Sequence, residues 1–243
     1  MYLPQGVSKA WKVLCLRGPS QRVWQVASLF ASCRNRIKRN KGMIRNIILD
    51  FGKVLVDYDF DIFFRRYVPN EERRKQFVPV LYNDGLTPVV DRGEKPFDEI
   101  VDDLIAEYPE FEPELRIFED RYPDLITGEI PGMKDLLKKL KAEGYKLYGL
   151  SNWCSKVYLT MEQYDIFDLL DGYIVSSEVH KIKPEPEIYQ CLFDRFHLNP
   201  EECVFTDDRV ENVEAGRRFG MDGIVFSDTA QFEKELRKLL NEN

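Results

Sequence analysis

Residues 45–55 read Arg-Asn-Ile-Ile-Leu-Asp-Phe-Gly-Lys-Val-Leu, an apolar run that ends at a carboxylate. Such a run is typical of a strand buried on both faces of a parallel sheet. Gly52 permits a tight turn directly after Asp50, because glycine lets the backbone approach closely. The stretch therefore predicts a central strand with Asp50 at its carboxyl end, although an aspartate that only caps a turn would fit the same pattern.

Further along the chain, short apolar runs alternate with segments of helical period, which indicates a parallel sheet flanked by helices. The predicted fold class is therefore α/β. The expected strands are residues 45–49, 146–150, 173–175, 203–206 and 223–226. The expected helices of this core are residues 133–143, 211–219 and 232–240.

Roughly 95 residues separate the first two strands, far more than a crossover connection needs. This segment lacks a convincing alternating run and is rich in Phe, Tyr, Glu and Arg, so we expect an inserted helical domain. Its expected helices are residues 61–67, 70–82, 96–108 and 113–122, interrupted at Pro79 and Pro88. The expected division is a core of residues 43–58 and 131–243, a helical cap of residues 59–130, and an N-terminal extension of residues 1–42.

Charge is distributed unevenly along the chain. Residues 1–42 hold nine Lys or Arg and no Asp or Glu. The chain has a formal net charge of −7, so residues 43–243 carry a net charge of −16. An acidic body disfavours nucleic acid as a partner, and the absence of a run of about 18 apolar residues disfavours a membrane span. Five scattered cysteines without CxxC spacing suggest neither a disulfide framework nor a zinc site, which favours a reducing, cytoplasmic location.

The basic segment 1–42 allows three interpretations. The favoured one is a misplaced translation start, with the protein beginning at Met43, because the segment shows no sustained helix or strand period. An acid-free targeting presequence and a basic arm for anionic surfaces are the alternatives.

Polar residues follow the second and third expected strands. Ser151 and Asn152 supply a hydroxyl and backbone N–H groups, which are the usual donors to a phosphate oxygen, although a helix N-cap uses the same residues. Lys183, in a Lys-Pro sequence, could neutralise a nucleophile and a phosphate together, although most lysines are merely solvated. The carboxyl ends of parallel strands meet at one edge of a sheet, so we expect these groups to lie near Asp50.

Asp207 and Asp208 close the fourth expected strand. Adjacent carboxylates repel each other unless a cation or a donor compensates, and oxygen ligands without clustered His or Cys favour Mg²⁺ over zinc. Asp50 is the expected partner ligand across the sheet. Asn212, four residues after Asp208, is expected to orient that carboxylate from an outer position.

The order of an aspartate nucleophile, Ser151, Lys183-Pro184 and Asp207-Asp208 resembles the four motifs of the haloacid dehalogenase (HAD) superfamily. The long insert sits where that family places its first, helical cap. The resemblance runs from Ile44 to the C-terminus, and residues 50–55 are most similar to phosphatases whose first motif reads DxGxVL, some of which act on sugar phosphates.

This resemblance implies a Mg²⁺-dependent hydrolysis of a small phosphorylated metabolite through an aspartyl phosphate. The implied nucleophile is Asp50, the implied metal ligands are Asp50, the Gly52 carbonyl and Asp208, and Asp207 and Asn212 lie in the outer shell. Ser151 and Asn152 would bind phosphate, and Lys183 would act as a charge clamp. Arg65, Arg66, Glu94 and Trp153 are candidate residues for lining the substrate site.

One departure concerns the general acid. The commoner family pattern DxDGT has a second Asp two residues after the nucleophile, where this chain has Gly52. General acid catalysis contributes about 10²–10⁴-fold, so its loss would favour leaving groups that need little protonation, such as sugar 1-phosphates or acyl phosphates. Asp57 and Asp59 lie nearby but are not expected to substitute.

Two other functions remain open from the sequence. A metal-free 2-haloacid dehalogenase also lacks the second Asp, but its reaction would not need Asp207-Asp208. A non-catalytic module that binds a phosphorylated ligand would explain Gly52 but not the other polar positions. The sequence gives no indication of the oligomeric state.

Overall fold

The computed structural model of the protein describes residues 43–81 and 86–241. The basic segment 1–42, and with it the three interpretations of its origin, lies outside the described residues. Residues Gly42–Asn243 form one compact unit. Among the described residues, none of the helices combines the length and the apolar character needed to cross a membrane.

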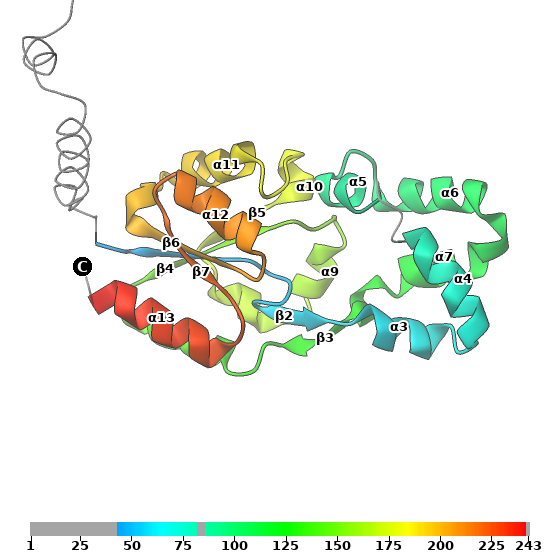
Figure 1. Cartoon of the computed structure of the whole chain (residues 1–243), viewed down its shortest axis with the longest axis horizontal. Coiled ribbons are helices and arrows are strands. Elements are labelled where there is room, and N and C mark those ends of the chain that lie inside the picture. The colour runs from blue at the N-terminus through cyan, green and yellow to red at the C-terminus, as the bar shows by residue number, and fades with distance from the viewer. Residues whose placement is uncertain (1–42, 82–85, 242–243) are drawn as a thin grey trace, which may run out of the picture. The chain divides into compact units, whose positions relative to one another are not determined.

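The core is a five-stranded sheet in the order β5-β4-β1-β6-β7 (Figure 1). Every neighbouring pair in it is parallel, as the long buried runs predicted. The strands are β1 (Asn46–Leu49), β4 (Lys146–Ser151), β5 (Gly172–Val175), β6 (Cys203–Asp207) and β7 (Asp222–Val225). The α/β fold class and all five expected strands are confirmed, with β1 in the centre of the sheet.

Helices cover both faces of this sheet because β1 sends alternate side chains to opposite sides. Ile47 and Leu49 join a core cluster with residues of α8 and α13, whereas Ile48 joins a second cluster with residues of α11 and α12. The bounds of these helices are Met133–Ala142 for α8, Pro186–Phe196 for α11, Val210–Arg218 for α12 and Thr229–Asn241 for α13. Two short helices, α9 (Val157–Met161) and α10 (Ser176–Val179), follow β4 and β5.

Apart from α8, the helices of the long segment between β1 and β4 group at the end of the sheet toward which β1 runs (Figure 1). They are α3 (Phe60–Tyr67), α4 (Glu71–Leu81), α5 (Leu86–Arg92), α6 (Phe97–Glu107) and α7 (Glu112–Asp120). Short 3-10 helices occupy Pro109–Phe111, Tyr122–Leu125, Asp165–Leu169 and Pro200–Glu202. Aromatic rings fill the interior of the insert, with edge-on contacts such as Phe64 against Phe77 at 5.5 Å.

Three details of the insert differ from the sequence prediction. The expected interruption at Pro79 is wrong, because α4 continues through it to Leu81 and buries Phe77 and Val80 on either side. Pro88 lies inside α5, a helix that was not expected. Two short strands, β2 (Val56–Tyr58) and β3 (Ile126–Glu129), pair antiparallel where the insert leaves and rejoins the core.

Candidate active site

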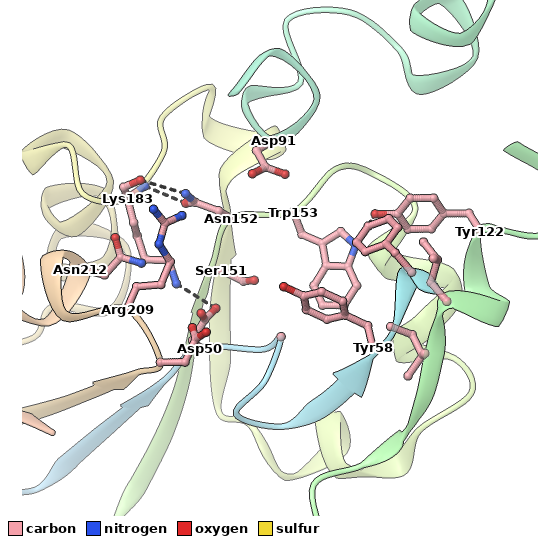
Figure 2. Close-up of a pocket in the computed structure, with 15 residues that line it drawn as sticks. Asp50, Tyr58, Asp91, Tyr122, Ser151, Asn152, Trp153, Lys183, Arg209 and Asn212 are labelled. Atoms are coloured by element: carbon pink, nitrogen blue, oxygen red, sulfur yellow. Dashed lines mark hydrogen bonds and ion pairs between the residues drawn. The ribbon is translucent and has the colours of Figure 1, made fainter. Parts of the chain in front are cut away.

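Asp50 lies directly beyond the carboxyl end of β1, between the ends of β4 and β6. Its backbone N–H donates to the Thr206 carbonyl at 3.0 Å, which continues the sheet by one residue. Its Oδ1 accepts a hydrogen bond from the Phe51 N–H at 2.7 Å. The side chain is mostly withdrawn from solvent but faces a pocket, which Figure 2 shows in close-up.

Lys183 is the buried cation of this pocket. Its Nζ lies 2.8 Å from Asp50 Oδ1 and 2.7 Å from Asp207 Oδ2, and it donates to the Leu150 carbonyl at 2.8 Å. Burial alone would lower the pKa of Lys183, but the charges of Asp207 and Asp50 raise it above its usual value. Lys183 therefore stays protonated and bridges two strand ends, and its role as a charge clamp stays a prediction.

The protonation of Asp50 depends on the charges around it. Burial raises the pKa of Asp50 to about 7, Lys183 opposes this rise, and Asp207 adds to it. Lys183 thus faces the two carboxylates of Asp50 and Asp207, so the cluster would be stabilised by a further positive charge. A cation bound there would favour the ionised, nucleophilic form of Asp50.

Asp207 is fully enclosed and tied on both oxygens. Besides Lys183, it accepts from Asn212 Nδ2 at 2.9 and 3.0 Å and from the Arg209 N–H at 2.9 Å. Asn212 was expected to orient Asp208, but its amide holds Asp207 instead. The reason is that α12 begins at Val210, which directs Asn212 back under the strand end. Asp207 is therefore a structural anchor for Lys183.

Asp208 is exposed toward the pocket and completes a group of three carboxylates. Oxygens of Asp50, Asp207 and Asp208 lie within 4.8 Å of one another. Burial and the neighbouring Asp207 raise the pKa of Asp208, although the charges of Lys183 and Arg209 oppose the rise. Because Asp207 is occupied by its own donors, Asp50 and Asp208 are the carboxylates with capacity for a metal, and hard oxygen donors of this kind fit Mg²⁺.

Ser151 and Asn152 reach the pocket from the end of β4 but are used differently. The Ser151 Oγ is buried and has no hydrogen-bond partner among the residues that the structure describes, so it is available to a ligand oxygen. Asn152 accepts from the Lys183 N–H at 2.7 Å and donates to the Lys183 carbonyl at 2.9 Å. The Asn152 side chain thus holds the loop that carries Lys183, here called the lysine loop. The expected phosphate contact by Asn152 stays a prediction.

Gly52 lies where the commoner motif has its second Asp, and the neighbouring space is taken by an aromatic ring. A Cβ atom added at Gly52 would lie 2.9 Å from Cε1 of Tyr58, and the ring of Trp153 is also within 4.0 Å. Asp57 pairs with Lys53 at 2.5 Å, and Asp59 caps α3 by accepting from the Ile62 N–H. Both carboxylates are thus engaged in other contacts, and the expectation that neither replaces the missing acid stays a prediction.

The pocket itself has a volume of about 230 Å³ and is lined from both the core and the insert. Trp153 was among the predicted lining residues. Besides the apolar Phe60, Leu125 and Ile126, four lining residues with polar groups were missed, which are Tyr58, Asp91, Tyr122 and Arg209. Arg209 directly follows Asp208, which was a usable signal, whereas the other three lie in the insert or its connecting strands. Of the other candidate lining residues, Arg65 pairs with Asp61 and Glu94 pairs with Arg92.

The sequence profile of the haloacid dehalogenase-like hydrolase family matches residues 92–226, more than half of the chain. The chain belongs to this family. It is therefore an enzyme of the HAD hydrolase type, as its motif order indicated.

Individual relatives of this HAD hydrolase are phosphatases. D-ribitol-5-phosphate phosphatase of Bacteroides thetaiotaomicron is 24% identical over 213 residues, which cover 82% of this chain and 100% of that protein. Sesquiterpene phosphatase astK of Aspergillus oryzae is 31% identical over 109 residues, but the match covers only 44% of this chain and 56% of that protein.

Solved structures show the same fold. A HAD family enzyme from Bacteroides thetaiotaomicron, solved with magnesium and inorganic phosphate, superposes with a TM-score of 0.65 at 20% identity and covers 76% of this chain and 96% of that one. A HAD-like hydrolase from Porphyromonas gingivalis superposes with a TM-score of 0.66 at 22% identity, covering 83% of this chain and 100% of that one.

Proposed function

We propose that this HAD hydrolase is a Mg²⁺-dependent phosphatase that forms an aspartyl phosphate on Asp50. The observation that carries the proposal is the contact between Asp50 and the buried Lys183 beside two more carboxylates and the unpartnered Ser151 hydroxyl. A nucleophile, a cation and a free donor at one sheet edge are the parts that phosphoryl transfer needs.

In the first step an oxygen of Asp50 attacks phosphorus while the bond to the leaving-group oxygen breaks. Lys183 neutralises negative charge near the attacking carboxylate, and Ser151 donates to a phosphate oxygen. A Mg²⁺ held by Asp50, the Gly52 carbonyl and Asp208 would neutralise further charge on the phosphate. In the second step water attacks the same phosphorus, the bond to Asp50 breaks, and inorganic phosphate leaves.

The size of the pocket supports a small substrate. A volume of about 230 Å³ suits a phosphorylated metabolite of a few carbon atoms rather than a polymer. The relative that matches over its whole length acts on D-ribitol 5-phosphate, which supports sugar and polyol phosphates as the first class to test. We also propose that residues 59–130 act as a cap that excludes water from the reaction, and that the protein works in the cytoplasm.

The test is phosphate release from 4-nitrophenyl phosphate and from a panel of sugar and polyol phosphates, each with Mg²⁺ and with EDTA. The expected result is metal-dependent release by the wild type and none by Asp50→Asn purified in parallel, which excludes a contaminating phosphatase. Metal-independent halide release from 2-haloacids, without phosphate release, would instead assign a dehalogenase. Binding of inorganic phosphate without turnover of any ester would assign a non-catalytic module.

A further inference from the structure

Asp91 is an acidic side chain of the insert that the proposed mechanism does not use. It lies in the last turn of α5, and Figure 2 shows its carboxylate directed into the pocket from the side of the insert, across from Asp50. A carboxylate in this place faces the direction in which a leaving group departs, because an in-line displacement expels the leaving group opposite the nucleophile.

The backbone around Asp91 is fixed to the core by several contacts between residues 91–93 and residues 176–185, here called the latch. The Ser176 hydroxyl donates to the Asp91 carbonyl, and His180 Nδ1 lies 3.0 Å from the Arg92 carbonyl oxygen. Arg92 donates to both carboxylate oxygens of Glu185, at 2.7 and 2.9 Å. The latch therefore holds Asp91 in place relative to the lysine loop.

Gly93 allows the latch to close tightly. Its φ of +64° is in the left-handed region, and a Cβ added there would lie 2.7–2.9 Å from atoms of Ser177. Only glycine combines this conformation with such a close approach of backbone. The backbone position of Asp91 is thus fixed by contacts with the core, unlike that of a residue on a free surface loop.

The chemistry of the site has a gap that Asp91 can fill. Gly52 offers no side chain for proton transfer, and Tyr58 lies against the position where one would be. Departure of an alkyl oxygen from phosphorus requires protonation for appreciable rates, since an alkoxide is a poor leaving group. An acid on the opposite wall would supply that proton.

We propose that Asp91 is the general acid and base of this enzyme, supplied by the insert in place of the carboxylate missing at position 52. This inference rests on the proposed function. In the first step the Asp91 carboxyl gives its proton to the leaving oxygen as the bond from phosphorus to that oxygen breaks and the bond to Asp50 forms. In the second step the Asp91 carboxylate takes a proton from the attacking water, which restores both aspartates when phosphate leaves.

The surroundings of Asp91 suit an acid that works near neutral pH. Burial raises the pKa of Asp91 to about 6, and the charges of Lys183 and Arg209 oppose the rise. Tyr122 and Cys154 also face it, and burial raises the pKa of each above its ordinary value, so both remain uncharged near neutrality. Asp91 therefore changes its protonation state in mildly acidic solution, so that its carboxyl can give a proton there and its carboxylate can act as a base at higher pH.

The proposal reverses the substrate preference expected from Gly52 alone. If Asp91 protonates the leaving oxygen, alkyl phosphates become good substrates. This agrees with a relative that is a phosphatase of D-ribitol 5-phosphate. Without this protonation, only esters with stabilised leaving groups would react well.

The decisive experiment compares kcat/KM of wild type and Asp91→Asn for 4-nitrophenyl phosphate and for D-ribitol 5-phosphate at saturating Mg²⁺. This constant reports the steps up to loss of the leaving group. We expect Asp91→Asn to lower it about 10²–10⁴-fold for the alkyl ester and less than about tenfold for the aryl ester, since nitrophenolate leaves without a proton. Asp98→Asn, at an exposed acid in the first turn of α6, is the matched control and should change neither value.

Equal losses on both esters would make Asp91 a binding or structural residue, and unchanged kinetics would remove it from the reaction, so either result overturns the proposal. If D-ribitol 5-phosphate is not a substrate, glycerol 3-phosphate serves as the alkyl ester. A wild type that releases no phosphate from any ester contradicts the proposed function itself, which is a different outcome from a wild type that is active on alkyl esters and insensitive to Asp91→Asn.

Discussion

The Nζ atom of Lys183 lies 2.8 Å from Oδ1 of Asp50, at a point where both side chains are almost fully withdrawn from solvent. A charge pair in such a place is strong because little water screens it. It also makes each partner dependent on the other, since an isolated buried charge is costly. Changes to either residue should therefore have large effects, and of different kinds.

Asp50→Asn should lower kcat by about 10⁴-fold or more, as removal of the nucleophile does in other enzymes that use covalent catalysis. The measurement is phosphate release by the purified variant, with mass spectrometry to exclude deamidation back to Asp. Asp57→Asn, at a nearby half-exposed aspartate that pairs with Lys53 and accepts from the Tyr58 N–H, is the control and should keep its activity. Substantial turnover by pure Asp50→Asn would show that Asp50 is not phosphorylated.

Lys183→Met should reduce stability in a pH-dependent way. The change leaves Asp50 and Asp207 together without their cation, and breaking a buried pair typically costs about 3–5 kcal/mol. One carboxylate then holds a proton with a raised pKa, so the loss should be smaller at pH 5 and larger at pH 8. Urea unfolding of this variant and of Lys181→Met at both pH values tests this. An equal loss at the two pH values would contradict the charge-clamp role.

Asp208→Asn should weaken the response to Mg²⁺ while the protein stays folded. Asp208 is exposed to the pocket, and its loss should raise the Mg²⁺ concentration for half-maximal activity by at least the roughly 10–100-fold seen for outer-shell residues. The rise in Tm that Mg²⁺ gives the wild type should shrink with it. Asp194→Asn on α11 serves as the exposed control. Unchanged Mg²⁺ dependence of Asp208→Asn would remove this residue from the metal site.

The sequence predicted the core well because its signals are local. An apolar run that ends at Asp50, and another that ends at Asp207, identify buried parallel strands and the edge where their carboxyl ends meet. The motif residues Ser151 and Lys183 then had to come together, since the order of parallel strands leaves them at that edge.

What the sequence missed depends on contacts between distant segments. Asp91 has no local signal, because its direction is set by the contacts of residues 91–93 with Ser176 and Glu185, which are 85 and 93 residues away from their partners. The helix α5 was also missed, because Pro88 was expected to interrupt helical structure there. Asn212 was assigned to the wrong carboxylate because its reach depends on where α12 begins, and helix starts are poorly defined by sequence alone.

Asp91→Asn should stabilise the protein at neutral and alkaline pH. Burial raises the pKa of Asp91 from 3.8 to about 6, so the folded state keeps this proton to higher pH than the unfolded chain does. Folded-state stability is therefore lost as pH rises through this interval and is not regained above it.

Asparagine removes the ionisation, and the variant should gain on the order of 2 kcal/mol at pH 8 and much less below pH 4. Denaturant unfolding at both pH values measures the difference. A variant that is less stable than the wild type at pH 8 would assign Asp91 a structural role, whereas a gain in stability joined to a loss of alkyl-ester turnover is the combination typical of a catalytic group.

Gly52→Asp should fail to restore acid catalysis unless Tyr58 is also reduced in size. The new Cβ would lie 2.9 Å from Cε1 of Tyr58, so the ring must move before the carboxylate can reach the leaving group.

In the Asp91→Asn background, Gly52→Asp alone should leave kcat/KM for D-ribitol 5-phosphate unchanged or lower. With Tyr58→Ala added, the same change should raise that constant about 10-fold or more relative to Asp91→Asn with Tyr58→Ala, because an acid contributes about 10²–10⁴-fold when well placed. The two changes should thus be strongly non-additive, as neighbouring residues that share one space are. Rescue by Gly52→Asp with Tyr58 intact would show that the ring is no obstacle, whereas absence of rescue in both backgrounds would mean that an acid at this position cannot reach the leaving oxygen.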